Sequence, residues 1–551
     1  MKSASKTSRP FWYKPPGAKS LANRVLILRA LSQSKTKIIN LPDSDDVKIM
    51  QEALESIQHG KTLIQVENAG TVCRFLCAAA PLLNKKVILD GVVAMRRRPI
   101  RDLVTALKKL GAKITYLGEK GYLPIQITPA NMHGGKIEIS MEKSSQYSSA
   151  LALIAPFLPG GITIKIVGKR RSESYFETTL QLLRQWGVKI EQKNSSQIVI
   201  HESIKPPKDY AIEPDIASSS YFYALAKFHH TKLPSHQFNT TIQAEREFFT
   251  ILKNLDTLKV IDAKNIPDTA LTLAVLAPLL NKPITFKNIS HLQYKESNRL
   301  ATLSKELRKI GAKVQVGTNS MNITPPKALI KNAIIQTHGD HRIAMAFSLI
   351  KSLFPQTAIK NPEVVQKSYP KFWEDFRTFH LSLNKNIVLI GMPGSGKTTL
   401  AKTLAQKWKY TFLDLDDLFE QKHQATIADF VAEHGYADFR KKETALLASM
   451  KPNTKLIIST GGGVINNAKN RERLEKLGTI VYLKESITTL TKRIKGSKRH
   501  ALFQKNTNTI LKKLELQRDT LYKETAHITL KGDNIQKKIQ LLEQQLFSHA
   551  V

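Results

Sequence analysis

One pattern of apolar and polar positions recurs along the first two thirds of the chain. Apolar residues at helical spacing lead to a turn residue and then to a short β-branched stretch, as in residues 103–115 and 303–315. Glycine at such a turn favours a left-handed helix cap. A sixth copy is expected over residues 338–376, and the recurrence predicts an α/β fold of repeated helix-plus-strand units. The turn residues of the five clearest copies are Gly60, Gly111, Gly187, Asp256 and Gly311.

A different pattern begins after residue 385. An apolar run at 386–390 is followed by the glycine-rich stretch 391–398 and by an amphipathic run at 399–406. Strand, turn and helix in this order are the setting of a phosphate-binding loop, in which backbone N–H groups converge on an anion. Lys397 is expected to reach the terminal phosphates and Thr398 to bind Mg²⁺. The loop predicts a second compact unit with a parallel sheet.

Length and cysteine content constrain the class of protein. A chain of 551 residues is too long for one core and predicts about three or four domains or lobes. Cys73 and Cys77 lie in one apolar run, so we expect both to be buried in a helix. Two cysteines without partners elsewhere in the chain also fit a protein of the reducing cytoplasm. The basic N-terminus lacks a following apolar segment and no run is long enough for a membrane span, so we expect neither secretion nor a membrane.

The formal net charge of +39 is the most unusual feature of the composition. It favours either a nucleic-acid partner or anionic small-molecule substrates. The lysines are scattered along helix faces and loops, and the sequence contains no recognisable nucleic-acid-binding module. We therefore expect no specific nucleic-acid partner, small anionic substrates, and a monomer.

Cationic side chains recur in the polar loops between the repeated units. They include Lys19 and Arg24, the arginines of residues 96–98, Arg299 and Arg342. Each lies at the start of a helix-like run, whereas cations on a solvated face would be distributed without that regularity. The spacing predicts one site for a multiply phosphorylated or carboxylated ligand.

Residues 14–377, which contain these loops in order, resemble 5-enolpyruvylshikimate-3-phosphate synthase. The resemblance implies a domain over residues 1–383 with the two-lobed enolpyruvyl transferase fold. One lobe is expected at roughly 14–209 and the other at 210–383 together with the N-terminal tip. It also implies a cofactor-free reaction that joins phosphoenolpyruvate to the 5-hydroxyl of shikimate 3-phosphate and releases phosphate.

The same resemblance implies the site residues. For phosphoenolpyruvate they are Lys19, Gly70, Arg98, Gln146, Arg299, Arg342 and Lys367. For shikimate 3-phosphate they are Lys19, Ser20, Arg24, Ser144, Ser145, Gln146, Ser172, Tyr175, Asp268, His291 and Lys295. The reaction needs a base for the hydroxyl and an acid for the methylene carbon, and the resemblance implies Asp268 and Glu296. Glu296 lies between Lys295 and Arg299, which predicts a depressed pKa unless burial opposes it.

Three features depart from that family. His291 stands where the family usually has Asn. Residues 54–67 of the first repeat and 256–266 of the fourth are shorter than usual, so a strand could be missing there. The family's relative that acts on UDP-N-acetylglucosamine has a reactive Cys in the loop equivalent to 91–98, where this chain has Val-Val-Ala-Met.

Residues 386–548 resemble shikimate kinase, within a unit that we place at 384–551 after a short linker at 384–386. Asp414 and Asp416 alternate at the end of an apolar run, which predicts one side of a strand, with one carboxylate for Mg²⁺ and the other for a substrate hydroxyl. The resemblance implies Lys397 and Asp416 as catalytic residues and Thr398 with Asp414 at the metal. For ATP it implies Gly394, Ser395, Gly396, Lys397, Thr398, Thr399 and the lid residue Arg499, although His-Ala-Leu follows Arg499 where Pro-Leu-Leu is usual. For shikimate it implies Asp416, Arg440, Gly462 and Arg518.

The two resemblances name consecutive reactions, so the sequence predicts a bifunctional enzyme of the shikimate pathway. Three alternatives remain open. The chain could be a basic scaffold or nucleic-acid-binding protein with inactive enzyme-like halves. It could combine a UDP-N-acetylglucosamine enolpyruvyl transferase with another small-molecule kinase. Nucleoside monophosphate kinases also share the phosphate loop, but the Asp-x-Asp pair and three successive glycines favour shikimate.

Overall fold

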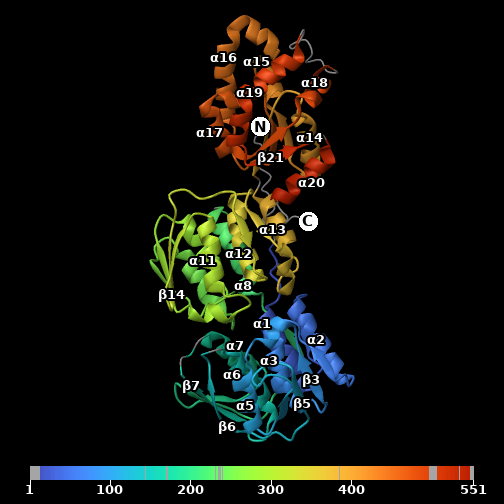
Figure 1. Cartoon of the computed structure of the whole chain (residues 1–551), viewed down its shortest axis with the longest axis vertical. Helices are drawn as coiled ribbons and strands as arrows, with labels where there is room; N and C mark the ends of the chain where they lie inside the picture. The colour runs from blue at the N-terminus through green and yellow to red at the C-terminus, as the bar shows by residue number, and fades with distance from the viewer. Residues whose placement is uncertain are drawn as a thin grey trace, which may run out of the picture.

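The computed structural model shows three bodies in a row (Figure 1). A blue-to-teal lobe and a green-to-yellow lobe face each other, and an orange-to-red unit is attached to the far side of the second lobe. None of the described helices is long and apolar enough to cross a membrane. The structure describes residues 13–142, 144–168, 170, 172–229, 231, 233, 238, 240–383, 385–495, 506–532 and 534–546.

In the described residues, the repeat forms three four-stranded sheets of one topology. In each sheet the first two strands run parallel, the last strand in sequence is antiparallel to the second, and the remaining strand pairs antiparallel with that last strand at the sheet edge. The first has the order β2 (Leu63–Gln65), β3 (Val87–Asp90), β5 (Ile125–Thr128), β4 (Lys113–Tyr116). The second is β6 (Gly135–Ser140), β7 (Ile162–Val167), β9 (Gln197–Ile200), β8 (Ile190–Gln192), and the third β11 (Val260–Asp262), β12 (Ile284–Lys287), β14 (Ser320–Thr324), β13 (Lys313–Val316).

Each of these units contributes two helices of different character. The first helix is α3 (Gly70–Ala79), α6 (Gln146–Ile154) or α10 (Ala270–Leu276), and it is buried on nearly every face. The second is α5 (Arg101–Lys109), α7 (Glu173–Gln185) or α11 (Arg299–Lys309), which is amphipathic. The glycines that follow the second helices have the expected left-handed conformation, with φ of 94°, 76° and 95° at Gly111, Gly187 and Gly311.

The remaining copies of the repeat are reduced. In the described chain, β1 (Lys37–Ile39) pairs only with β10 (Asp209–Ala211), and β15 (Ile334–Gln336) only with β16 (Ala358–Lys360). The short segments 54–67 and 256–266 nevertheless keep their strands, β2 and β11. Cys73 and Cys77 are buried in α3, as expected. Further helices are α1 (Lys19–Leu31), α2 (Asp45–Gln58), α4 (Val93–Arg96), α8 (Ile216–Phe228), α9 (Glu247–Lys253), α12 (His341–Leu353) and α13 (Phe372–Ser382).

The C-terminal unit is built on a five-stranded parallel sheet, counted over its described residues. Every residue of its central strand is buried, because helices cover both faces. The strand order is β18 (Thr411–Asp414), β19 (Leu456–Ser459), β17 (Asn386–Ile390), β20 (Gly478–Lys484), β21 (Ile528–Lys531). The helices are α14 (Lys397–Trp408), α15 (Leu415–His423), α16 (Ile427–Ser449), α17 (Ala468–Leu477), α18 (Ile487–Lys495), α19 (Thr507–Thr525) and α20 (Ile535–Leu546).

The C-terminal unit abuts the second lobe, with residues 383–385 alone between α13 and β17. Asn386, where the expected linker and the expected strand overlapped, is the buried first residue of β17, and its side chain bonds the backbone of the 451–456 turn. Across the junction, the Lys351 ammonium donates to the carbonyl of Gln545 at 3.0 Å. Glu543 of α20 accepts from Arg377 of α13 at 3.2 Å.

Two candidate active sites

A polar cleft lies between the two N-terminal lobes and gathers most of the residues that the sequence predicted. Those that line the cleft are Lys19, Ser20, Arg24, Gly70, Arg98, Ser144, Ser145, Gln146, Ser172, Tyr175, Asp268, His291, Lys295, Glu296 and Arg342. Arg299 and Lys367 complete the set from behind, since each forms an ion pair with a carboxylate of the lining. The cleft therefore unites positions that are more than 300 residues apart in the chain.

The fold explains why cations and amides converge there. Helices of both lobes begin at the cleft, with Lys19 opening α1, Gly70 opening α3, Gln146 opening α6 and Arg299 opening α11. The first N–H groups of a helix have no partner within the helix, and the helix dipole adds positive potential. Repetition of one unit thus directs several anion-binding helix ends toward a single space.

Buried ion pairs organise the second-lobe wall of the cleft. The guanidinium of Arg299 contacts Asp268 at 2.8 Å, Glu296 at 2.8 Å and Asp340 at 2.7 Å. A second guanidinium, that of Arg342, contacts Asp268 at 2.8 Å. Asp340 also caps α12 by accepting from the Arg342 N–H, so the cap fixes the arginine that follows it.

This arrangement controls the charge of both predicted catalytic carboxyls. Burial would raise the pKa of Asp268, but Arg342, Arg299 and Lys295 outweigh it and hold the pKa far below its usual range. Burial likewise opposes the effect of Arg299 and Lys367 on Glu296, and the cations again hold its pKa well below normal. The depressed pKa that the sequence predicted for Glu296 is confirmed, and both groups are carboxylates at neutral pH.

The first-lobe wall is held together by side chains that brace one another. The Lys19 ammonium contacts Asp46 of α2 at 2.7 Å. Arg24 donates to the Thr179 hydroxyl at 2.8 Å and to the carbonyls of Ser20 and Tyr175, so it joins α1 to α7. Burial lowers the pKa of Arg24 to about 10. Arg24 therefore shapes the pocket as well as lining it.

A side chain at Gly70 would require two arginine side chains to shift. A Cβ atom there would lie 2.5 Å from Arg74 Nη1 and 2.7 Å from Arg98 Nη1. Arg74 in turn donates to the Gly70 carbonyl at 2.9 Å. Glycine thus allows two guanidinium groups to approach the N-terminus of α3.

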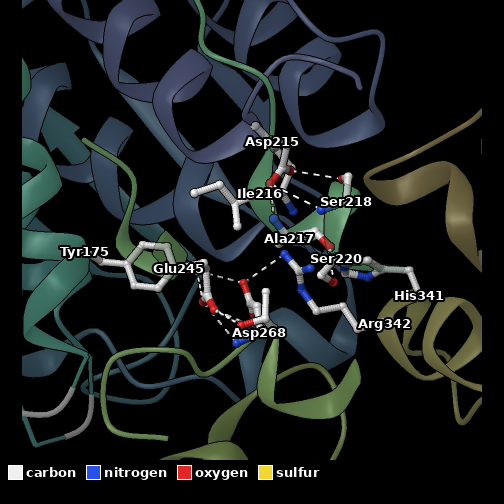
Figure 2. Close-up of polar contacts among 12 residues, drawn as sticks. Tyr175, Asp215, Ile216, Ala217, Ser218, Ser220, Glu245, Asp268, His341 and Arg342 are labelled. Atoms are coloured by element: carbon white, nitrogen blue, oxygen red, sulfur yellow. Dashed lines mark hydrogen bonds and ion pairs between the residues drawn. The ribbon is translucent and has the colours of Figure 1, made fainter. Parts of the chain in front are cut away.

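Several lining residues had no signal in the sequence analysis. Glu245, in the short helix η3 (Ala244–Arg246), sits in a run of alternating charges that is typical of a solvated surface, yet it is buried. Figure 2 shows it beside Tyr175 and Asp268, with Arg342 on the other side of Asp268. Asp46, Asp215 and His341 were also missed and also line the cleft. Asp215 caps α8 by accepting from Ala217 and Ser218.

The second site surrounds the glycine-rich loop of the C-terminal unit. The Lys397 ammonium donates to the carbonyls of Gly391 and Met392 at 2.9 and 3.0 Å, so it folds over the loop. Gly394 and Gly396 have φ of 77° and 88°, which turn the loop into α14. Ser395 is buried in the loop and Thr399 follows in the first turn of α14. The expected strand–loop–helix arrangement is present.

A hydroxyl and a carboxylate meet beside this loop. The Thr398 hydroxyl donates to Asp414 at 2.9 Å and lies 3.2 Å from the Ser459 hydroxyl. Oxygen donors of this kind suit Mg²⁺, which takes few protein ligands and completes its shell with water and phosphate. Consistently, the described residues hold no cluster of three or more His, Cys, Asp or Glu that could bind a metal ion by itself.

The predicted strand position of Asp416 is wrong. Strand β18 ends at Asp414, whose side chain accepts from the Asp416 N–H at 3.1 Å and caps α15. Asp at a cap and acidic residues in a first turn stabilise a helix start, so the chain turns helical two residues earlier than period two requires. Asp416 still reaches the glycines, because a Cβ on Gly461 would lie 2.8 Å from its carboxylate.

The other predicted shikimate residues gather around residues 461–463. The Arg518 guanidinium donates to the Gly462 carbonyl at 3.1 Å, and a Cβ on Gly463 would collide with the guanidinium of Arg440. Glu443, which the sequence analysis did not select, contacts Arg440 at 2.6 Å. Two arginines and two carboxylates can hold a small ligand that carries a carboxylate and hydroxyls. Arg499 and residues 500–502 lie outside the described residues.

Comparison with protein families identifies two matches. The family model of EPSP synthase (3-phosphoshikimate 1-carboxyvinyltransferase) matches residues 13–64 and 55–376. The model of shikimate kinase matches residues 393–547. The first match alone covers more than half of the chain.

Individual relatives agree with this division. The chain is 35% identical over 405 residues to the 3-phosphoshikimate 1-carboxyvinyltransferase of Marinomonas sp., with 66% of this chain and 95% of the relative covered. It is 31% identical over 576 residues to a pentafunctional AROM polypeptide of Lodderomyces elongisporus, covering 87% of this chain and 36% of the relative. The chain thus spans little more than a third of the AROM polypeptides that it matches.

A solved structure supports the fold of the N-terminal part. EPSP synthase from Acinetobacter baumannii matches with a TM-score of 0.52 at 19% identity, covering 66% of this chain and 94% of that one. The two-lobed architecture of repeated units is therefore shared.

Proposed function

Because the chain belongs to the EPSP synthase family and its C-terminal part matches shikimate kinase, we propose that it catalyses two consecutive steps. The C-terminal unit phosphorylates shikimate with ATP. The cleft between the lobes then transfers the enolpyruvyl group of phosphoenolpyruvate to the 5-hydroxyl of the resulting shikimate 3-phosphate. The single observation that carries this proposal is the cleft, where buried cations and two ionised carboxyls face one space.

In the synthase step, Asp268 takes the proton of the 5-hydroxyl as its oxygen bonds to C2 of phosphoenolpyruvate. Glu296 gives a proton to the methylene carbon, and its carboxylate then takes a proton back from the resulting methyl group as phosphate leaves and the double bond is restored. Because cations hold Glu296 ionised, its proton must arrive together with the anionic substrates, which compete for Arg299 and Lys367. The phosphate and carboxylate groups of the substrates bind to the cationic side chains of Lys19, Arg98, Arg342 and Lys367.

In the kinase step, the backbone of the glycine-rich loop and Lys397 hold the phosphates of ATP, and we assign Arg499 to the same substrate. Asp416 accepts the proton of the attacking hydroxyl while Arg440 and Arg518 hold the carboxylate of shikimate. Thr398 and Asp414 fit Mg²⁺, which would neutralise charge on the transferred phosphoryl group.

Two other readings are less well supported. A scaffold with inactive halves has no use for Asp268 and Glu296 ionised inside a cleft, because buried charges are costly without a function. The enzyme acting on UDP-N-acetylglucosamine would need a cysteine in loop 91–98, and the cysteines of this chain are Cys73 and Cys77. The described residues of each site come from one chain, so we also propose a monomer, acting in the cytoplasm on small molecules.

The proposal is tested with purified full-length protein given shikimate, ATP, Mg²⁺ and phosphoenolpyruvate. ADP, phosphate and the enolpyruvyl product are measured separately. All three should form, and phosphate should appear only when both shikimate and phosphoenolpyruvate are present. If the protein forms ADP from shikimate and ATP but makes no enolpyruvyl product when it is supplied with shikimate 3-phosphate and phosphoenolpyruvate, the synthase assignment is ruled out.

A further inference from the structure

The hydroxyl of Tyr175 makes two contacts that a single hydrogen atom cannot satisfy. It lies 2.8 Å from Glu245 Oε1 and 2.9 Å from Asp268 Oδ2 (Figure 2). A carboxylate oxygen without a proton only accepts hydrogen bonds, and a tyrosine hydroxyl has one hydrogen to donate. If both carboxyls were ionised, one of these short contacts would be a repulsion between lone pairs. One carboxyl must therefore donate to Tyr175.

The surrounding charges decide which carboxyl is protonated. Asp268 is paired with the guanidinium groups of Arg299 and Arg342, both at 2.8 Å, and so remains an anion. None of the ion pairs in the described part of the chain includes Glu245. Its Oε2 atom accepts from the N–H and hydroxyl of Thr269, at 3.1 and 2.7 Å. Its Oε1 atom accepts from the Asp268 N–H at 3.1 Å and, when protonated, can still do so while its O–H points toward Tyr175. Tyr175 stays a hydroxyl, because burial and Asp268 raise its pKa well above normal.

We propose that Glu245 is a positioning residue of the synthase site, which in its protonated form donates to Tyr175 and thereby directs the tyrosine hydroxyl onto Asp268. The inference rests on the proposed function, in which Asp268 is the base and Tyr175 contacts shikimate 3-phosphate. Tyr175 belongs to the first lobe and both carboxyls to the second, so the chain of hydrogen bonds also joins the lobes at the base.

Ionisation of Glu245 would break this arrangement. Burial and the charge of Asp268 raise the pKa of Glu245 to about 7, so the proton is lost as the pH rises through neutrality. Two anions then compete for one hydroxyl, and Tyr175 is no longer held on Asp268. Among the described residues, the titratable and charged groups around the cluster are Tyr175 of α7, Asp215 and Tyr221 at α8, Asp268 before α10, Lys295, Glu296 and Arg299 at α11, and Arg342 of α12.

The test compares the pH dependence of the synthase step in the full-length wild type, E245Q and E247Q. The amide of Gln donates to Tyr175 at every pH, although it cannot accept the Asp268 N–H that Glu245 accepts at 3.1 Å. Glu247 is exposed two residues away, so E247Q is a matched control for charge. The buffers, phosphoenolpyruvate and shikimate 3-phosphate are the same for all three proteins, and so their own titrations cancel in the comparison.

For the wild type and E247Q, kcat/KM for shikimate 3-phosphate should fall about tenfold per pH unit above the pKa of Glu245, chiefly through KM. E245Q should have a lower value at about pH 6 but no such fall, and E245A, which cannot donate, should be the slowest. An alkaline fall of equal steepness in E245Q, or none in the wild type, would overturn the proposal. A wild type without synthase turnover would instead refute the proposed function.

Infrared spectroscopy provides a readout that does not depend on turnover. The difference spectrum between wild type and E245Q should contain the C=O stretching band of a neutral carboxylic acid at about pH 6, and this band should vanish at about pH 8.5. Only carboxylate bands at both pH values would show that Glu245 is ionised throughout, which contradicts the proposal even if E245Q is slow.

Discussion

The two candidate sites present cationic and backbone groups to a phosphate-bearing ligand in different ways. The cleft relies on side chains from both lobes, with Arg299 and Arg342 buried and held by carboxylates. The glycine-rich loop of the C-terminal unit relies on backbone N–H groups of consecutive residues, with Lys397 folded over them. The first design depends on long-range packing, whereas the second depends on the local conformation of a few consecutive residues.

This difference has consequences for stability. Removing a cation from the cleft leaves several buried carboxylates without an ion-pair partner and without access to water. Removing Lys397 takes a donor from the uncharged carbonyls of Gly391 and Met392. The cleft should therefore couple catalysis to folding, and the glycine-rich loop should not.

The largest effect is expected for Arg299→Ala. It leaves Asp268, Glu296 and Asp340 without a shared partner, and should lower the free energy of unfolding of the N-terminal part by about 3–5 kcal/mol. Denaturant unfolding measures this, with Arg308→Ala on the exposed face of the same helix as the control. A loss as small as that of the control would show that the buried network does not hold the lobe together.

Gly70→Ala sharpens the comparison at a single atom. The added methyl must displace Arg74 and Arg98, so the KM for phosphoenolpyruvate should rise roughly tenfold. A tenfold change corresponds to a loss of about 1.4 kcal/mol of binding free energy. Gly118→Ala is the matched control, because its Cβ would meet only Pro124 at 3.5 Å. An unchanged KM would mean that Arg98 can move without loss of binding.

The smallest effect is expected at the junction between the second lobe and the C-terminal unit. Glu543 accepts from Arg377, Lys407 and Trp408, so Glu543→Gln should lower the free energy of unfolding of the C-terminal unit by roughly 1 kcal/mol. Glu524→Gln, on the exposed face of α19, is the control. Equal stability of the two variants would indicate that the contacts of Glu543 do not contribute to the stability of the C-terminal unit.

The contribution of Glu543 to the free energy of unfolding should depend on pH. Burial would raise its pKa, but Trp408 and Lys407 outweigh burial and lower the pKa of Glu543. A depressed pKa contributes stability that is present above the ordinary pKa of Glu and is lost as the pH falls through the folded-state value. The difference between wild type and Glu543→Gln should thus shrink in acid.

The sequence predicted the two sites to different extents, because one is built from consecutive residues and the other from residues far apart in the chain. Residues 391–398 are contiguous, so their spacing alone indicated the loop and its helix. The cleft residues lie in separate loops, and periodicity showed only that cations recur there; their grouping came from the family resemblance. Asp416 was misplaced because a capping interaction ended the strand early. The linker was drawn one residue too long because a polar residue at the start of a buried strand, Asn386, looks like part of a linker.

Glu245 could not be found from the sequence at all. Its neighbours Arg246 and Glu247 are exposed, so the run has the composition of a surface helix. Only the packing of α7 against η3 brings Tyr175 to it. The site thus depends in part on tertiary contacts that leave no local pattern.

Two independent active sites in one chain should respond separately to mutation, and a pair of variants tests this most directly. Lys397→Ala and Asp268→Asn are each assayed for ADP formation from shikimate and for enolpyruvyl transfer to supplied shikimate 3-phosphate. Lys397→Ala should abolish the first rate, a loss of several kcal/mol of transition-state stabilisation, and spare the second. Asp268→Asn should do the reverse, so that shikimate 3-phosphate accumulates. An equal fall of both rates in either variant would contradict the account.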